Sequence, residues 1–152
     1  MKINVKSVIT SGIIAGLLIS LSAITMVPVV GNEMDLVLES RGLPPLSNMA
    51  MMFFVMLSFI NGITLILLYA LVKERLGAGI RTAVIVSVVF WFFKYFLSNV
   101  SLIAYGFMPV RLTVIGTIWG LGELLLAGIV GSKLYKEVKQ LPQALQTVKH
   151  SE

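Results

Sequence analysis

Four long runs of apolar residues, separated by short polar segments, dominate the chain. The runs cover about residues 7–30, 48–72, 82–107 and 112–134. A helix rises about 1.5 Å per residue, so each run is long enough to cross a hydrocarbon core of ~30 Å. Short connections between consecutive runs favour antiparallel neighbours. The pattern therefore predicts an all-α membrane protein, built as an antiparallel up-down bundle of four transmembrane helices.

A cleaved signal peptide is the competing interpretation of the first run, because Lys2 and Lys6 precede its apolar core. The run is longer than the core of a signal peptide, however, and Ala23-Ile24-Thr25 is a poor cleavage site. We therefore predict that the first run is a retained transmembrane helix. Residues 1–136 are then expected to form one transmembrane domain.

The longest polar segment, residues 31–47, connects the first two runs. Asn32 is a suitable N-cap for a short helix, and Gly42 and Pro44 are suitable places for that helix to end. We expect this short helix to lie on the membrane surface within an extracytoplasmic loop. A loop that recognises a substrate is the alternative interpretation.

Apolar residues make up 57% of the chain and charged residues 12%, which is typical of membrane proteins and not of soluble globular domains. The chain has no cysteine, and its single histidine is His150. A disulfide framework, a thiol redox centre and a metal site built from histidine or cysteine are therefore excluded. We expect no metal and no cofactor.

Basic residues are distributed unevenly between the two sides of the predicted bundle. One side carries Lys2, Lys6, Lys73, Arg75, Arg81, Lys133, Lys136, Lys139 and Lys149. The other side carries Arg41 and Arg111. Because basic residues favour the cytoplasmic side, both termini are predicted to lie in the cytoplasm. Residues 137–152 are then a basic cytoplasmic tail, in which Pro142 can begin a short helix. The net charge of +5 indicates topology and contact with anionic lipid, and not binding of nucleic acid.

Glycines recur every fourth residue in two of the runs. Gly12 and Gly16 share one face of the first run, and Gly116 and Gly120 form a GxxxG pair in the fourth. Small residues at this spacing let two transmembrane helices approach closely. We therefore expect these four glycines to lie at helix interfaces.

Two ionisable residues lie near the middle of apolar runs, Lys94 in the third and Glu123 in the fourth. A lone charge at the bilayer centre costs roughly 2.5–3.5 kcal/mol on insertion scales, so such residues rarely lack a partner. Asn61 lies about midway along the second run. Helical spacing places Ser98 on the same face of the third run as Lys94. We therefore predict a buried polar layer of these four residues.

Two interpretations of this layer remain open. In the structural interpretation, Lys94 and Glu123 form an ion pair that fixes the register of the helices, and Asn61 satisfies a remaining donor or acceptor. In the functional interpretation, burial changes the proton affinity of one or both charged groups, so that a proton or a competing solute exchanges there. Neighbouring aromatic residues can also hold Lys94 by cation–π contact.

Three short motifs resemble a known group of proteins. The motifs are Gly42-Leu43-Pro44-Pro45-Leu46-Ser47 before the second run, Leu76-Gly77-Ala78-Gly79-Ile80-Arg81-Thr82-Ala83 before the third, and Trp119-Gly120-Leu121-Gly122-Glu123 in the fourth. Together they resemble a group of small, uncharacterised four-span integral membrane proteins of bacteria. The resemblance implies the same fold and a location in the bacterial cytoplasmic (inner) membrane, but no activity. The chain is not similar to small multidrug exporters, whose essential glutamate lies in the first span, nor to quinone-linked disulfide enzymes, which require cysteines.

The sequence favours a non-enzymatic role, in which a small multi-pass membrane protein binds partner membrane proteins or lipid through its glycine faces. The alternative is an oligomeric proton-linked transporter or channel for a small solute, in which Glu123 carries the proton, Lys94 tunes it and Asn61 contacts the solute. An enzyme acting on lipid ranks third, because the sequence shows no nucleophile–base pair, acidic metal cluster or phosphate-binding loop. The expected partners are the lipid bilayer and a second copy or another membrane protein, and not nucleic acid.

Overall fold

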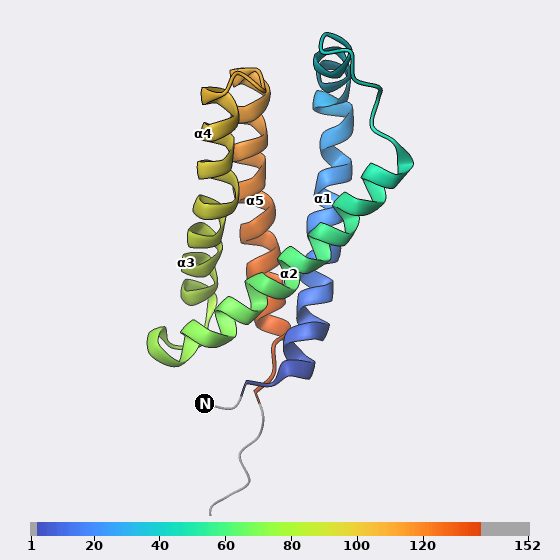
Figure 1. Ribbon diagram of the computed structural model, residues 1–152. Helices are drawn as coiled ribbons and strands as arrows, with labels where there is room; N and C mark the ends of the chain where they lie inside the picture. Colours follow the sequence, from blue (N-terminus) through green and yellow to red (C-terminus); the bar gives the residue numbers. More distant parts are fainter. Residues whose placement is uncertain (1–2, 138–152) are drawn as a thin grey trace, which may run out of the picture.

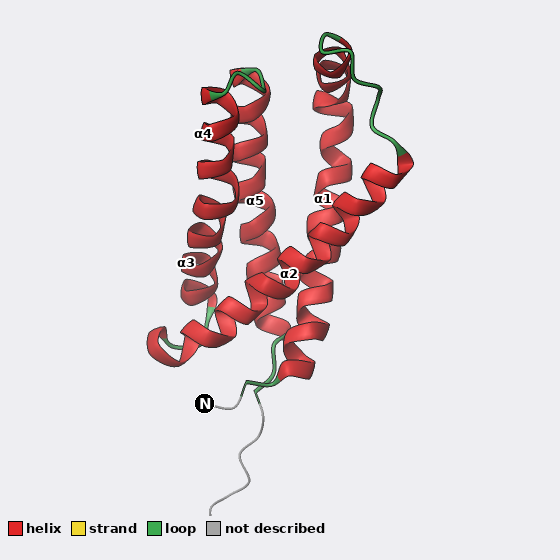
Figure 2. Ribbon diagram, in the orientation of Figure 1, coloured by secondary structure: helices red, strands yellow, loops and turns green. Residues whose placement is uncertain are grey.

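The computed structural model describes residues 3–137, and the regular secondary structure of this part of the chain is entirely helical (Figure 2). The elements are α1 (Val5–Glu39), α2 (Asn48–Leu76), α3 (Ile80–Trp91), η1 (Phe92–Phe96), α4 (Leu97–Ala104) and α5 (Val110–Leu134). Elements α3, η1 and α4 follow one another directly and form the third span. Four segments are long and apolar enough to cross a membrane, so the chain is a multi-pass membrane protein. The predicted bundle of four transmembrane helices is confirmed (Figure 1). The predicted helix at Pro142 lies outside the described residues.

Helix α1 is longer than the sequence predicted. It runs unbroken through Pro28 and Gly31 and ends at Glu39, so the connection to α2 covers only residues 40–47. The expectation of a separate surface helix capped by Asn32 is wrong, because a glycine inside a helix costs only about 1 kcal/mol and does not oblige the helix to end. The 35 residues of α1 span about 52 Å, so α1 is tilted or extends beyond a hydrocarbon core of ~30 Å.

Glycines end α1 and α4 in the same way. Gly42 and Gly106 each have a φ of 68°, which lies in the left-handed region that favours glycine. The Leu43 N–H donates to the Leu38 carbonyl at 2.9 Å, and an equivalent bond follows Gly106. These are the bonds of the Schellman motif. Both connections at this end of the bundle therefore begin with a locally determined turn.

Helices α1 and α2 cross at three glycines. A Cβ added to Gly12 would lie 2.5 Å from Ile63 Cα. A Cβ added to Gly16 would lie 2.6 Å from Phe59 Cα, and one added to Gly62 would overlap backbone atoms of both α1 glycines. The two backbones are thus in direct contact, which larger residues would prevent. Helix α2 can therefore run obliquely across α1, as Figure 1 shows.

The two ends of the bundle differ in packing. We name the end that holds the start of α1, the α2–α3 turn and the end of α5 the terminal end, and the opposite end the loop end. The buried residues of α1 stop at Ser20, those of α2 begin at Ser58, and those of the third span stop at Ser87. Only α5 has buried residues near both of its ends. Toward the loop end, α1 separates from α4 and α5 (Figure 1).

The apolar core accordingly lies in the terminal half of the bundle. It consists of Ala15, Ile19, Leu65, Ile66, Tyr69, Ala83, Val86, Leu124 and Ala127. All four spans contribute to this cluster, so burial of apolar side chains joins them at this level. In the loop half, lipid or another molecule must cover the apolar side chains that the bundle leaves exposed.

The segment that follows α5 fastens the terminal end. The Tyr135 ring packs edge-on against Tyr69 with centroids 6.3 Å apart, and Lys73 Nζ lies 4.3 Å from the centroid of the Tyr135 ring. Lys73 also forms an ion pair with Glu137. The Asn4 N–H donates to the Tyr135 hydroxyl at 3.3 Å. We name these contacts the clamp, because they tie the start of α1, the end of α2 and the end of α5 together.

Polar contacts connect α1 to α5 toward the loop end. Trp119 Nε1 donates to Ser22 Oγ at 3.0 Å, and Arg111 forms an ion pair with Glu33. Beyond α1, Arg41 Nη2 donates to a carbonyl of the α4–α5 turn at 2.8 Å. Since surface ion pairs of this kind contribute little stability, the loop half is held together more weakly than the terminal half.

Candidate functional site

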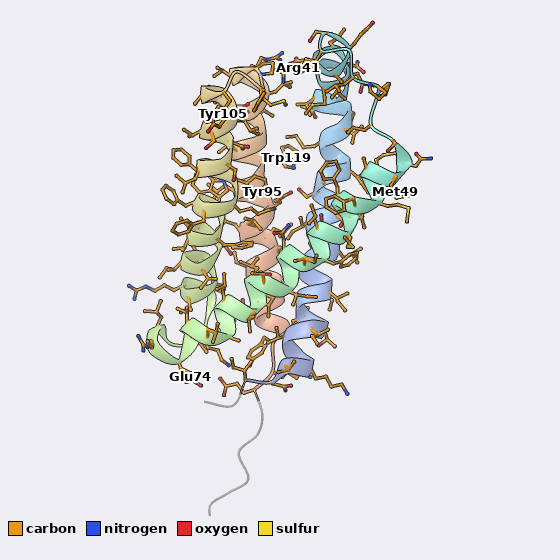
Figure 3. The ribbon with its side chains drawn as sticks, in the orientation of Figure 1. Arg41, Met49, Glu74, Tyr95, Tyr105 and Trp119 are labelled. Atoms are coloured by element: carbon orange, nitrogen blue, oxygen red, sulfur yellow. The ribbon has the colours of Figure 1, made fainter. Side chains whose placement is uncertain are left out.

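Three hydrogen-bonded side chains connect the third span to α5 near the middle of the bundle. Lys94 Nζ donates to the Tyr95 hydroxyl at 2.9 Å, and the Tyr95 hydroxyl donates to Glu123 Oε1. Lys94 Nζ also lies 4.0 Å from the centroid of the Tyr95 ring. No direct ion pair joins Lys94 to Glu123 within residues 3–137. We name this arrangement the tyrosine bridge, and Figure 3 labels Tyr95 at its centre.

The tyrosine bridge is largely enclosed by the helices. Glu123 is 6% exposed, and Lys94 and Tyr95 are half-buried. Charges in a poorly hydrated interior interact strongly and are costly to leave without partners. Tyr95 lowers this cost, because its hydroxyl accepts from the ammonium and donates to the carboxylate at the same time. The geometry therefore lets one hydroxyl relay a proton between Lys94 and Glu123.

The backbone that carries Lys94 is a π-helix. Within η1, the Leu97 N–H donates to the Phe92 carbonyl, which lies five residues back and not four. Such a segment adds one residue to an α-helix and often occurs at functional sites. At 3.6 residues per turn, one added residue rotates everything that follows by about 100°. The faces of α4 are therefore offset from those of α3.

This offset decides which polar side chains reach α5. In an uninterrupted helix, Ser98 would share a face with Lys94. In the structure Ser98 is exposed, whereas Asn99 is half-buried and its Nδ2 donates to Thr117 Oγ1 at 2.7 Å. By the same shift of one residue, Tyr95 contacts α5 where Lys94 was expected. The prediction that Ser98 belongs to the buried layer is wrong, and Asn99 takes its place.

Gly120 provides the space for the Tyr95 ring. A Cβ at Gly120 would lie 2.9 Å from carbon atoms of that ring. Gly116, one turn along α5, would meet no atom within 4 Å if a Cβ were added. The two glycines of the predicted GxxxG pair therefore have different surroundings. Gly120 lies against the tyrosine bridge, and Gly116 lies at no helix interface of the described bundle. Gly12 and Gly16 lie where α1 crosses α2.

Asn61 does not join the tyrosine bridge. It is half-buried on α2, and no hydrogen bond joins its side chain to Lys94, Tyr95 or Glu123 within the described part of the chain. The structure thus brings together two of the four residues predicted for the polar layer, and it does so through a third residue that the prediction did not assign to the layer.

Sequence reasoning missed Tyr95 as the linking group, and it missed Asn99 and Thr117. Thr117 is a polar junction between the third span and α5, since its carbonyl accepts from Trp91 Nε1 at 2.8 Å and its hydroxyl accepts from Asn99. The available signal in the sequence was Asn99, an asparagine inside an apolar run. Whether Asn99 faces α5 depends on the helical offset at η1, which no local residue pattern predicts.

No protein-family model matches the chain, and no match is found among curated proteins or solved structures. Within residues 3–137, no three acidic, histidine or cysteine side chains form a group that could hold a metal ion. The length and hydropathy of the four candidate spans identify the molecule as a small multi-pass membrane protein in contact with the lipid bilayer.

Proposed function

We propose that this protein is a proton-linked carrier of a small solute, in which Glu123 carries the proton and Lys94 tunes its release. The tyrosine bridge is the observation that supports this proposal most strongly. Ionisable side chains inside a membrane are expensive and usually mark a functional site. Here one of them, Lys94, lies in a π-helical segment, which independently favours a functional site. Since four helices leave little room for a solvated path, the carrier works as an oligomer.

The uneven packing of the bundle supports the same function. A carrier exposes its site to one side of the membrane at a time. The clamp and the apolar core close the terminal half, whereas the loop half lacks such a core. The tyrosine bridge lies between these halves. We propose that the terminal end faces the cytoplasm of a bacterium, because most basic residues flank the spans on that side.

Replacing Tyr95 by phenylalanine tests the proposed function. The Tyr95→Phe variant keeps both charges and the ring against Gly120, but it loses the hydroxyl that links Lys94 to Glu123. A hydrogen bond to a charged group contributes about 1.5–3 kcal/mol, so we expect proton uptake to fall about 10- to 100-fold. The rate is measured in liposomes that contain the purified protein and enclose a pH-sensitive dye.

The Tyr105→Phe variant is the matched control for this measurement. Tyr105 is an exposed tyrosine at the end of the same span and should leave proton uptake unchanged. Equal proton uptake by wild type, Tyr95→Phe and protein-free liposomes would reject the carrier.

A second candidate function is binding of another membrane protein or lipid without transport. The loop half of α2 favours it, because its methionine and phenylalanine side chains are exposed, and Met49 projects away from the bundle in Figure 3. The exposed residues are Met49, Met51, Met52, Phe53, Phe54 and Met56. Flexible methionine side chains suit adaptable binding surfaces. Gly12, Gly16 and Gly120 support this candidate less, because they pack inside the bundle.

Photo-crosslinking in native membranes distinguishes the second candidate. A photoreactive amino acid at Met52 should form a defined adduct with a partner protein if the loop half of α2 is a binding surface. The same probe at Leu126, an exposed apolar residue on α5, serves as the control. Lipid adducts alone at both positions would show that Met52 simply faces the bilayer.

A further inference from the structure

We propose that Thr117 of α5 is a positioning residue for the tyrosine bridge, and that the third span turns during transport so that Lys94 replaces Tyr95 against Glu123. The inference rests on the proposed carrier function and describes how its site changes state. We name the observed arrangement the tyrosine register, and the alternative, in which η1 becomes α-helical, the lysine register. The two registers differ by one residue in the face that α4 presents to α5.

Thr117 binds the third span on both sides of η1. Before η1, Trp91 Nε1 donates to the Thr117 carbonyl at 2.8 Å, and after η1, Asn99 Nδ2 donates to the Thr117 hydroxyl at 2.7 Å. Trp91 and Asn99 are eight positions apart, which in an uninterrupted α-helix would separate their directions by about 80°. The residue added in η1 reduces this angle to about 20°, so both side chains share one face. The two bonds to Thr117 therefore favour the tyrosine register.

The Thr117 hydroxyl is oriented to receive Asn99. It donates to the Thr113 carbonyl at 2.6 Å, so it is left as an acceptor for the Asn99 amide group, which donates from Nδ2. Gly120, three positions further along α5, makes room for the Tyr95 ring. Because residues three apart are neighbours on the surface of a helix, one patch of α5 holds Asn99 and Tyr95 together. Thr117 thus acts on the tyrosine bridge through the orientation of the third span.

The lysine register would present a polar face to α5. In an uninterrupted helix, Lys94, Ser98 and Ser101 share one face. In the structure both serines are exposed, and the Ser101 hydroxyl donates back to the Leu97 carbonyl at 3.0 Å. Polar residues within a membrane usually face the interior of a bundle. If η1 becomes α-helical, α4 turns by about 100° and brings this polar face against α5.

Few contacts oppose a turn of α4. None of its residues is buried, and among the described residues its side chains make one hydrogen bond to α5, from Asn99 to Thr117. Gly116 shares a face of α5 with Gly120, yet a Cβ on Gly116 would meet no atom within 4 Å, so this interface is loosely packed. The core residues of the third span all precede η1 and can stay in place. The third span therefore combines a fixed half with a movable half.

The two registers give the candidate site two states. In the tyrosine register, one hydroxyl lies between Lys94 and Glu123 and can relay a proton. In the lysine register, the ammonium group pairs directly with the carboxylate and the hydroxyl no longer links them. A carrier has to alternate between states of its site, and a turn of α4 supplies such an alternation.

Cysteine pairs report the two registers, because the chain has no cysteine of its own. The pair Asn99→Cys with Thr117→Cys reports the tyrosine register, and Ser98→Cys with Thr117→Cys reports the lysine register. The full-length variants are oxidised in liposomes with copper phenanthroline and oxygen, and disulfide formation is read as loss of labelling by a maleimide-linked polyethylene glycol. We expect both pairs to form disulfides. Val100→Cys with Thr117→Cys is the control and should stay reduced, because Val100 is exposed and faces α5 in neither register.

Thr117→Val tests the positioning role, because it removes the hydroxyl and keeps the shape of the side chain. We expect it to slow proton uptake about fivefold, as for one lost hydrogen bond, and Thr117→Ser to restore the wild-type rate. Thr64→Val is the matched control. The Thr64 hydroxyl also donates within its own helix, to the Ile60 carbonyl at 2.8 Å, so its loss should leave proton uptake unchanged.

The outcomes separate the two registers from the carrier function. If wild type takes up protons but the Ser98 pair stays reduced while the Asn99 pair is oxidised, the lysine register is overturned and the carrier stands. If both pairs form disulfides but wild type takes up no protons, the carrier fails and the two registers stand. Equal proton uptake by Thr117→Val and wild type, or equally slow uptake by Thr117→Ser and Thr117→Val, overturns the positioning role.

Discussion

Replacing Gly62 by valine is expected to lower the free energy of unfolding by about 3 kcal/mol. A Cβ at this position would overlap backbone atoms of Gly12 and Gly16, and a backbone cannot move aside as a flexible side chain can. The helices would have to separate where α1 and α2 cross, so core packing between them would also be lost. The loss is measured by denaturant unfolding of the purified protein in detergent micelles, followed by tryptophan fluorescence.

The Gly116→Val variant is the control for Gly62→Val. Gly116 also lies inside a long helix, but a Cβ there would meet no atom within 4 Å. Valine and glycine differ by less than about 1 kcal/mol in helix propensity, so this variant should unfold almost as wild type does. An equal loss of stability in both variants would show that the crossing of α1 and α2 does not depend on Gly62.

Removing one charge from the tyrosine bridge is expected to destabilise the protein more than removing both. Lys94→Met leaves the buried Glu123 carboxylate without its cation, and Glu123→Gln leaves the ammonium without its anion. Loss of one partner from a buried pair typically costs about 3–5 kcal/mol. In the double variant no buried charge remains, so most of this loss should be recovered. Unfolding of wild type, both single variants and the double variant in micelles gives the coupling energy directly.

Ser98→Ala is the control for this comparison, because Ser98 is a polar residue in the same span that lies exposed. It should change stability little and should not couple to Glu123→Gln. If the losses of the two single charge variants simply add in the double variant, the tyrosine bridge does not connect Lys94 to Glu123 energetically.

The spans themselves were predictable, because the length of an apolar run is a local property and a lipid-exposed backbone must satisfy its own hydrogen bonds. The residue at which α1 ends was not predictable from the sequence. Gly31 and the acidic residues after it resemble the start of a surface loop, but the helix continues to Glu39. A glycine inside a helix costs only about 1 kcal/mol, so Gly31 did not determine where α1 ends.

The candidate site was predictable only in part. Lys94 and Glu123 are conspicuous as charged residues inside apolar runs, and their opposite charges led to the prediction that they lie close together. Tyr95 was hidden among neighbouring aromatic residues. Assigning it to the contact with α5 requires the one-residue offset of η1, which the residue pattern alone does not show. A strict 3.6-residue period therefore selected Ser98 where the structure has Asn99.

The clamp makes assembly of the bundle depend on the order of synthesis. Asn4 and Tyr135 are bonded although 131 positions separate them. A growing chain can pair α1 with α2 through their glycines as soon as both have entered the membrane. It cannot close the terminal end until α5 has followed. The segment that follows α5 therefore completes contacts of the start of α1, and until α5 has been made Lys73 lacks both the Tyr135 ring and the Glu137 carboxylate.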